Sequence, residues 1–252
     1  MRFSDKVVLV TGSSRGIGRC TAQMFAKEGA TVAVHYRANQ AAAEEAKASL
    51  HGGPHFIVQG DVRDPGDAKR MVDTVVGALG GLDILVNNAG VFESHPAHSV
   101  SYEEWQSKWD KILRTNLIGA ANVSYCAIQH MLKDGGGRIV NVSSRGAFRG
   151  EPNGPAYGAS KAGMNAMGQS LAKSLAPHGI FVHTVAPGFV ETDMASRDLV
   201  GAKGEEIRAQ SPLNRVAKPE EVAHTILFLA SQETEFLTGC IVDVNGASYL
   251  RT

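Results

Sequence analysis

The sequence carries no excess of charge of either sign and few cysteines. Lys plus Arg number 25 and Asp plus Glu number 25, which gives the 252 residues a formal net charge of zero. A nucleic-acid groove or a polybasic membrane surface needs an excess of Lys and Arg, and we therefore exclude both functions. The three cysteines, Cys20, Cys126 and Cys240, lie more than a hundred residues apart. This spacing predicts neither a disulfide framework nor a zinc cluster, but small buried side chains in a reducing cytoplasm.

Long hydrophobic runs and linkers are also missing. The longest apolar runs, such as 226–230, fall far short of the roughly 20 residues that span a bilayer. The N-terminus leads into four apolar residues before Thr11, too few for a signal peptide. No Pro/Ser-rich linker, repeat or low-complexity tract divides the chain, and 43% hydrophobic residues are enough for one sizeable core. We expect a single cytoplasmic domain over 1–252, with no membrane or nucleic-acid partner.

Short runs rich in Val and Ile alternate with Ala-rich segments of helical period. This alternation of strands and helices along the whole chain predicts parallel strands joined by helical crossovers. The strands are continuously apolar rather than alternating, which predicts burial on both faces. The expected fold is α/β, a single doubly wound Rossmann-type sheet of seven parallel strands with helices on both faces. The predicted strands are 7–10, 32–34, 56–58, 84–86, 139–142, 181–185 and 241–244; the predicted helices are 17–27, 41–50, 67–79, 103–131, 156–175 and 220–230.

One interval departs from this alternation. No strand-like run occurs between Pro187 and Pro219, and the interval contains three glycines and a further proline. A long insertion in a compact domain is usually a lid or a binding loop. It follows the sixth strand, at the carboxyl edge where open α/β sheets bind ligands. We therefore expect a substrate lid at about 188–214.

A glycine-rich segment, Thr-Gly-Ser-Ser-Arg-Gly-Ile-Gly over 11–18, follows the first strand and opens the first helix. Glycines there allow a tight turn and a close approach to a pyrophosphate, whose charge the helix N-terminus stabilises. The same letters also fit Gly-x-Ser-x-Gly, the nucleophile elbow of α/β-hydrolases, with Ser14 as the nucleophile. An elbow needs several strands before it, whereas this segment follows the first, which makes a hydrolase the weaker alternative.

Four segments together resemble the short-chain dehydrogenase/reductase family. They are the glycine-rich segment 11–18, Asn-Asn-Ala-Gly at 87–90, Tyr-Gly-Ala-Ser-Lys at 157–161 and Pro-Gly at 187–188. They occur in the family's order and span essentially the whole chain. Within the family, the sequence most resembles the group of 3-oxoacyl-carrier-protein reductase-like enzymes and sugar or polyol dehydrogenases. The resemblance implies an NADP(H)-dependent oxidoreductase that interconverts a ketone and a secondary alcohol by hydride transfer.

Tyr157 and Lys161 are the expected catalytic pair. They are four positions apart on a predicted helix and therefore share one face. Ketone reduction needs a proton donor, and a neighbouring ammonium favours the phenolate of a tyrosine whose ordinary pKa is near 10. The resemblance implies that Ser144, rather than adjacent Ser143, orients the carbonyl oxygen. It also implies that Asn116 distorts its helix and holds a water linking the lysine to solvent.

The end of the second predicted strand decides the expected cofactor. NAD enzymes of this type carry an acidic residue there that binds the ribose hydroxyls, whereas this sequence has Tyr36 followed by Arg37. Arg37 would attract a 2′-phosphate, and Arg15 resembles the second phosphate-binding cation of NADPH enzymes. We predict NADP(H); if both arginines are merely solvated, an NAD(H)-preferring sugar or polyol dehydrogenase is the alternative. The implied cofactor site comprises Gly12, Ser14, Arg15, Gly16, Ile17, Gly18, Tyr36, Arg37, Asp61, Val62, Asn88, Ala89, Gly90, Tyr157, Lys161, Pro187, Gly188, Val190 and Thr192.

Other features say less about function. His95 and His98 invite a metal site, but two histidines without a third ligand predict a surface loop and no metal. Bacterial acyl-carrier reductases commonly place arginines where this chain has 134–137 and His178, so a carrier-protein partner stays open. Family position places Phe92, Phe148, Arg149, Glu151, Phe189 and Met194 on the substrate side. A catalytically silent dinucleotide-binding regulator is a further alternative, which the retained Tyr157 and Lys161 oppose.

Small residues on the helix that carries Tyr157 predict how the chain assembles. Ala159, Ala162, Gly163 and Ala166 permit another layer to pack closely against that helix. Family members usually bury such a helix between subunits. We expect a homotetramer, or failing that a dimer.

Overall fold

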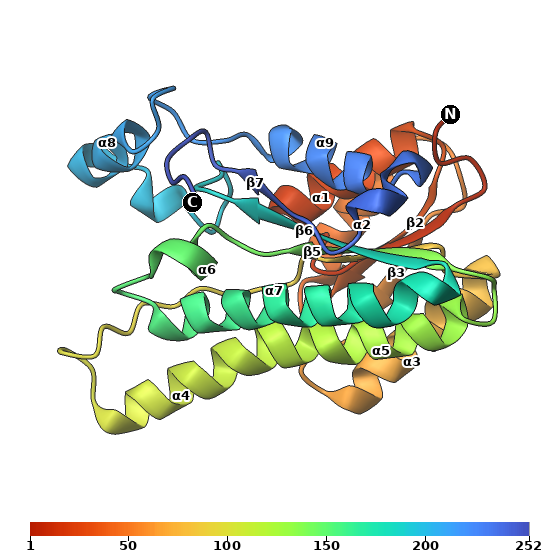
Figure 1. Cartoon of the computed structure of the whole chain (residues 1–252), viewed down its shortest axis with the longest axis horizontal. Helices are drawn as coiled ribbons and strands as arrows, with labels where there is room; N and C mark the ends of the chain where they lie inside the picture. The colour runs from red at the N-terminus through yellow and green to blue at the C-terminus, as the bar shows by residue number, and fades with distance from the viewer. Residues whose placement is uncertain (252) are drawn as a thin grey trace.

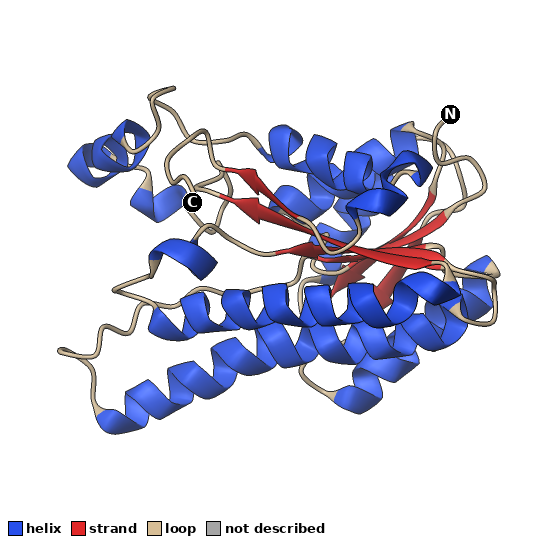
Figure 2. Ribbon diagram, viewed as in Figure 1, coloured by secondary structure: helices blue, strands red, loops and turns tan. Residues whose placement is uncertain are grey.

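A seven-stranded parallel sheet forms the centre of the protein (Figures 1 and 2), as seen in a computed structural model that describes residues 1–251. The strand order is β3-β2-β1-β4-β5-β6-β7, and each neighbouring pair is parallel. The predicted fold class is confirmed, and every predicted strand falls within an observed one. The strands are β1 Val7–Val10, β2 Thr31–Tyr36, β3 Phe56–Gln59, β4 Ile84–Asn87, β5 Gly137–Val142, β6 Ile180–Pro187 and β7 Ile241–Val244.

Helices cover both faces of the sheet. Helices α1, α2 and α9 lie on one face, and α3, α5 and α7 lie on the other, with α4 leading into α5 (Figure 1). The α-helices are α1 Gly16–Lys27, α2 Gln40–Ala48, α3 Pro65–Leu79, α4 Tyr102–Leu113, α5 Gly119–Met131, α6 Gly146–Arg149, α7 Pro155–Leu175, α8 Gly201–Ala209 and α9 Pro219–Leu229. A π-helical turn, Arg114–Ile118, joins α4 to α5, and 3-10 turns occur at Ala176–His178, Ser196–Asp198 and Gln232–Leu237.

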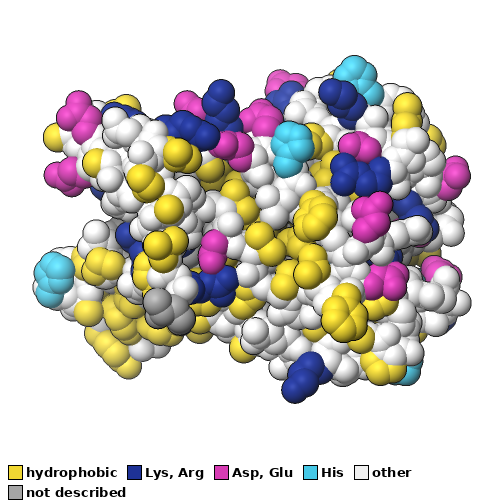
Figure 3. Space-filling view, turned by 45° about the horizontal axis from the view of Figure 1, so that its top comes forward, with side chains coloured by type: hydrophobic (Ala, Val, Ile, Leu, Met, Phe, Trp, Pro, Cys, Tyr) yellow, Lys and Arg dark blue, Asp and Glu magenta, His cyan; other side chains and the backbone are white. Residues whose placement is uncertain are grey.

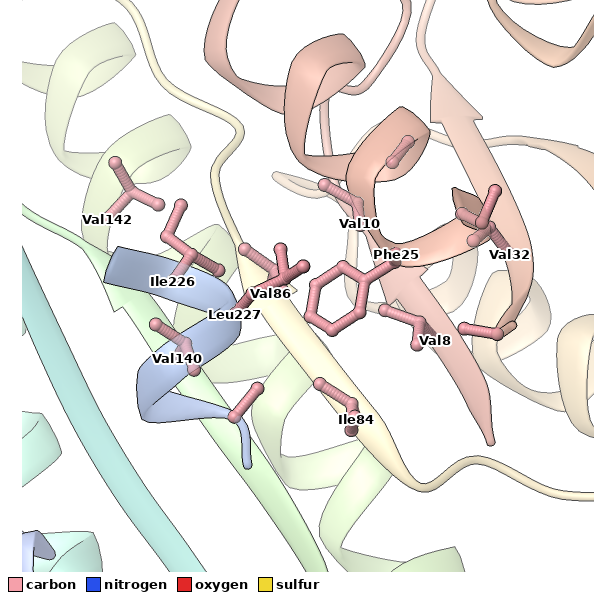
Figure 4. Packing of buried hydrophobic residues seen from close by; sticks show 14 of the residues in the cluster. Val8, Val10, Phe25, Val32, Ile84, Val86, Val140, Val142, Ile226 and Leu227 are labelled. Carbon is pink, nitrogen blue, oxygen red and sulfur yellow. The ribbon is translucent and has the colours of Figure 1, made fainter. Parts of the chain in front are cut away.

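The two layers of helices create two hydrophobic cores. Successive strand residues point to opposite faces, so Val8 and Val10 pack with Phe25 and Leu227 on one side (Figure 4), while Leu9 packs on the other. All five side chains are fully buried. Burying a side chain of this size contributes about 1.5–3 kcal/mol. The continuous apolar strands therefore do lie between two cores.

The chain reverses its direction of sheet growth between β1 and β4. Open α/β sheets bind ligands in the crevice outside the carboxyl ends of the strands at such a switch point. The glycine-rich loop follows β1 and the 87–90 segment follows β4, so the two lie against each other. A Cβ atom on Gly12 would lie 3.0 Å from the Ala89 Cα, and the φ of Gly12 is +66°. Only glycine tolerates both the contact and this backbone conformation.

The interval after β6 contains a helix that the sequence did not suggest. Helix α8, Gly201–Ala209, lies beyond the carboxyl ends of β6 and β7 (Figure 1), and Val190 forms an isolated bridge with Ala217. Its sequence, GAKGEEIRA, contains one large apolar residue, Ile207. So short a pattern has too few apolar positions to reveal a helical period.

His95 corrects the prediction of a plain surface loop at 95–98. Its side chain is fully buried and packs against the ring of Trp105. Its Nδ1 lies 2.7 Å from the Glu93 carbonyl, and its Nε2 accepts the backbone N–H of Ala156 at 3.2 Å. The histidine ties the loop to the start of α7, an arrangement decided by segments distant in sequence.

Features of the surface and of the cysteines complete the description. Cys20 is buried, whereas Cys126 and Cys240 are partly buried, and all three are free thiols. On the face in Figure 3, basic and acidic side chains are interspersed, in line with the balanced composition. Across residues 1–251, every helix is too short or too polar to cross a bilayer.

Candidate active site

A cleft of about 510 Å³ opens at the carboxyl ends of the strands, between the glycine-rich loop, the loop after β4 and the segment after β6. Most of the residues predicted from the sequence line this cleft. They are Gly12, Ser14, Arg15, Gly16, Ile17, Tyr36, Arg37, Val62, Asn88, Ala89, Gly90, Ser144, Tyr157, Lys161, Pro187, Gly188, Val190 and Thr192. The structure therefore brings together residues from both halves of the chain.

Three predicted site residues, Gly18, Asp61 and Asn116, do not line the cleft. A Cβ atom on Gly18 would lie 2.5 Å from Asn88 Nδ2, so this glycine permits close packing rather than ligand contact. The Asp61 carboxylate pairs with Arg63 at 2.5 Å, which holds the pKa of Asp61 below its usual value. Asn116 is fully buried. Asp61 was expected at the cofactor site, but its carboxylate is paired with the neighbouring Arg63 guanidinium.

His35 supports the glycine-rich loop from below, a contact that the sequence did not reveal. The backbone N–H of Gly12 donates to His35 Nδ1 at 2.8 Å, and His35 Nε2 lies 3.0 Å from the Gly60 carbonyl oxygen. An acceptor at Nδ1 places the proton on Nε2. Burial lowers the pKa of His35, although the hydrogen bond to Gly60 opposes this. The ring is therefore neutral and joins the ends of β1, β2 and β3.

Helix α7 carries Tyr157 and Lys161 on one face. The Lys161 Nζ lies 5.8 Å from the centroid of the Tyr157 ring and donates to the Val142 carbonyl at 2.7 Å. Burial lowers the pKa of Lys161 to about 8. The lysine therefore remains mostly protonated at neutral pH and holds a positive charge beside the ring.

The environment of Tyr157 acts on its pKa in both directions. Burial raises the pKa, a hydrogen bond with Ser144 lowers it, and the negative charge of Glu151 raises it. The Phe92 ring packs edge-on against Tyr157, with ring centroids 5.2 Å apart. Without a ligand, the net effect keeps the tyrosine hydroxyl protonated, the form that can donate a proton.

The two adjacent serines after β5 have different surroundings. Ser143 is buried, and its hydroxyl donates to the Lys161 carbonyl at 3.3 Å. Both serines border the cleft, but Ser144 is the more exposed of the two, and its Oγ accepts the Gly146 N–H at 3.0 Å. The geometry therefore gives Ser144 access to a ligand and Ser143 a structural contact.

Asn116 lies in the π-helical turn between α4 and α5, so the helix is distorted where the family resemblance implied. Its Oδ1 accepts the Val91 N–H at 2.8 Å, and its Nδ2 donates to the Val91 carbonyl and to Ser160. A Cβ atom on Gly90 would lie 3.4 Å from Asn116 Oδ1 and 3.5 Å from Lys161 Nζ. Asn116 thus ties the loop after β4 to α7, close to the lysine.

The substrate side differs in part from the sequence prediction. Phe92, Glu151, Phe189 and Met194 line the cleft, whereas Phe148 and Arg149 do not. The Arg251 guanidinium covers the Phe148 ring at 4.3 Å, on the side of the C-terminal segment. This contact joins the end of the chain to α6, which no local pattern could predict.

Arg145 is a cleft residue that the sequence reasoning missed. It is 3% exposed and donates to Ser248 at 2.5 Å and to Gln210 at 2.5 Å. Its guanidinium lies over the Phe189 ring at 5.2 Å. Burial lowers the pKa of Arg145 to about 10. Its position directly after Ser144 was the one signal available in the sequence.

The glycine-rich loop and the cleft fit a nicotinamide dinucleotide. The backbone of the loop approaches Ala89 so closely that a side chain on Gly12, a residue that lines the cleft, would displace it. The N-terminus of α1 follows at Gly16, where backbone N–H groups stabilise a pyrophosphate. The residues present are therefore compatible with this cofactor.

Comparisons with known proteins agree with this geometry. The family model described as enoyl-(acyl carrier protein) reductase matches residues 12–247. The chain is 39% identical to a 3-oxoacyl-[acyl-carrier-protein] reductase from Staphylococcus aureus over 249 residues, 97% of this chain and 98% of that protein. It is 40% identical to the protein of the same description from Thermotoga maritima over 250 residues, 98% of each chain. The corresponding Aquifex aeolicus protein is 36% identical over 256 residues, 99% of each chain.

These similarities extend over the whole sheet, from the glycine-rich loop to the segment after β7. They include the four segments that carry the family resemblance, and each of these segments contributes residues to the cleft. The chain belongs to the short-chain dehydrogenase/reductase family of oxidoreductases.

Proposed function

We propose that the protein is an NADP(H)-dependent reductase that interconverts a ketone and a secondary alcohol. The observation that carries the proposal is the convergence of Ser144, Tyr157 and Lys161 in one cleft with the glycine-rich loop. This arrangement supplies a proton donor, a cation and a hydroxyl group next to a dinucleotide-sized groove. A silent dinucleotide-binding regulator would not need the three side chains together, and a hydrolase would need an activated Ser14.

The side chains have separate roles in the proposed reaction. A bound nicotinamide dinucleotide supplies the hydride. Tyr157 Oη donates a proton to the carbonyl oxygen, and the Ser144 hydroxyl orients that oxygen. Lys161 holds its charge beside the tyrosine and binds the ribose, which favours the phenolate left after proton transfer. Asn116 supports the relay that returns a proton from solvent.

The preference for NADP(H) depends on the end of β2. Tyr36 is buried there, and the next residue, Arg37, is exposed in the cleft, where a 2′-phosphate would find a cation and, at position 36, no carboxylate. Arg15 Nη1 lies 3.9 Å from Asp193 Oδ2, and both side chains are largely exposed. Solvent screens so exposed a pair, so a phosphate can compete for the arginine.

Replacing Tyr157 with Phe tests the proposal. The variant keeps the ring that packs against Phe92 and removes only the transferable proton. General acid catalysis contributes about a hundredfold to ten-thousandfold, and kcat for NADPH-dependent ketone reduction should fall by that factor. NADPH affinity, measured by fluorescence titration, should stay within about twofold. Tyr102→Phe, on an exposed tyrosine, is the matched control, and near-normal turnover of Tyr157→Phe would contradict the mechanism.

Reduction of a 3-oxoacyl group on an acyl-carrier protein is a second candidate, favoured by the activity for which the relatives are named. In this chain Asp134 and His178 stand where such enzymes commonly carry arginines that dock the acidic carrier. We expect weak carrier docking, visible as little dependence of KM on salt when an acyl-carrier substrate is supplied.

We propose a homotetramer, located in the cytoplasm. Ala159, Ala162 and Ala166 form an exposed strip of small residues on α7, and Ile118 and Tyr125 are exposed on the adjoining helical segment. Such a surface permits close packing with a second chain. Light scattering should give about four times the chain mass, and a stable monomer at working concentration would overturn the proposal.

A further inference from the structure

Resting on the function proposed above, we propose that Glu151 selects the substrate class. Its carboxylate accepts a hydrogen bond from a hydroxyl group that the substrate ketone carries close to its carbonyl. The enzyme would then act on hydroxyketones and their diols in preference to plain ketones, keto acids or acyl thioesters.

Glu151 lies on the substrate side of the cleft, next to the catalytic serine. Helix α6 packs over the N-terminal half of α7, and Glu151 lies in the turn between them (Figure 1). A Cβ atom on Gly146 would lie 2.7 Å from Glu151 Oε1, and the Gly146 N–H donates to Ser144 Oγ. A ligand whose carbonyl reaches Ser144 and Tyr157 therefore brings its neighbouring atoms toward this carboxylate.

The carboxylate has unused capacity to accept hydrogen bonds. Among the side chains that the structure describes, its hydrogen-bond donor is Arg149 Nε, at a long 3.5 Å. The other nearby guanidinium, Arg145, donates to Ser248 and Gln210. An ionised carboxylate accepts up to about four hydrogen bonds, and the Glu151 side chain is 19% exposed. A hydroxyl donor on a ligand would satisfy a partly desolvated charge.

The charge of Glu151 otherwise works against the reaction. It raises the pKa of Tyr157 and so disfavours the phenolate that proton donation leaves behind. A hydrogen bond from the substrate would spread this charge, whereas a substrate carboxylate would meet electrostatic repulsion. Phe92, Phe189 and Met194 supply apolar parts of the wall. Arg145 also lines the cleft, but its guanidinium already donates to Ser248 and Gln210, so Glu151 is the charged group there with capacity left to bind a ligand.

A purely structural role for Glu151 makes a different prediction. The side chain packs beside Gly146, and its Cβ lies 3.9 Å from the position of a Cβ atom on Gly158. If it only held the turn between α6 and α7, its replacement would affect all substrates by the same factor. Substrate discrimination therefore separates the two roles.

The experiment compares ketones that differ in a single group. The pairs are hydroxyacetone with 2-butanone, and 4-hydroxy-2-butanone with 2-pentanone, in which a methyl group replaces the hydroxyl; acetoacetate supplies the anionic probe. Initial rates of NADPH consumption give kcat/KM for the wild type, for Glu151→Gln, and for Glu233→Gln as a control at a distant exposed carboxylate. The amide keeps the shape and removes the charge, and unchanged NADPH affinity and thermal unfolding would show that the fold is intact.

We expect the wild type to prefer the hydroxylated member of at least one pair by about tenfold to a hundredfold, the effect of one hydrogen bond to a charged group. Glu151→Gln should lose most of this preference and improve acetoacetate. It should leave the methyl ketones as fast as before or faster, because the charge that disfavours the Tyr157 phenolate is gone. Equal losses on all probes, or no preference in the wild type, would overturn the inference while the proposed function stands. If none of these ketones supported NADPH consumption, both the inference and the proposed function would be overturned.

Discussion

Replacing His35 with Leu should destabilise the protein and weaken cofactor binding together. The side chain is 2% exposed and makes two hydrogen bonds, one to the Gly12 N–H and one to the Gly60 carbonyl. Leucine leaves the buried Gly60 carbonyl and the partly buried Gly12 N–H without a partner, at about 1–3 kcal/mol each, with the Gly12 group toward the lower end. The free energy of unfolding should therefore fall by about 2–6 kcal/mol, a large share of the 5–15 kcal/mol typical of a native protein.

Two further variants separate the loop contact from the general loss of stability. The side-chain oxygen of Asn can reach the place of His35 Nδ1 and accept the Gly12 N–H, leaving only Gly60 without a partner. The longer Gln reaches toward Gly60 instead and leaves Gly12 unsatisfied. Both variants should lower the free energy of unfolding by about 1–3 kcal/mol, but only His35→Gln frees the glycine-rich loop from its contact at Gly12.

Urea unfolding, followed by tryptophan fluorescence, and NADPH titration measure the two effects. We expect NADPH to bind about tenfold to a hundredfold more weakly to His35→Gln and His35→Leu, and nearly normally to His35→Asn. Equal affinities for the Asn and Gln variants would show that the Gly12 contact does not position the loop. An unchanged unfolding free energy in His35→Leu would refute the reasoning altogether.

Three further predictions concern catalysis, cofactor choice and pH. Ser144→Ala should lower kcat for ketone reduction by about a hundredfold or more, and Ser143→Ala should have a milder effect; the reverse order would reassign the serine. Tyr36→Asp combined with Arg37→Ala should move the ratio of kcat/KM from NADPH toward NADH by about tenfold to a hundredfold, and an unmoved ratio would show that Arg37 is only solvated. Burial lowers the pKa of His183 and of His35 in the native state. Below about pH 6.5 the unfolded chain therefore takes up protons at these histidines that the native state does not. The unfolding free energy should therefore fall as pH drops from about 6.5 toward the lowered native pKa values. Chemical unfolding at a series of pH values measures this, and an unfolding free energy that does not change with pH would contradict it.

The sequence alone was sufficient for the strands and for the shared face of Tyr157 and Lys161 on α7. Strands buried between two cores require apolar residues at every position, so runs such as 7–10 and 139–142 are visible without any structure. Tyr157 and Lys161 share a face because the α-helix repeats every 3.6 residues, a property of the backbone itself. In both cases the information is local, because the repeat of the strand or helix backbone determines which way each side chain points.

Contacts between segments far apart in the chain were decided only by the tertiary structure. In the sequence, nothing distinguishes His35 from the other residues of its strand; the fold places Gly12 and Gly60 on either side of its ring. Phe148 was expected in the cleft, but Arg251, about a hundred positions later, covers it. His95 was expected at the surface, yet it is buried against Trp105. Local periodicity sets which way a side chain points from its own element, whereas its partners depend on how loops turn and how layers pack, and these are determined by the whole chain at once.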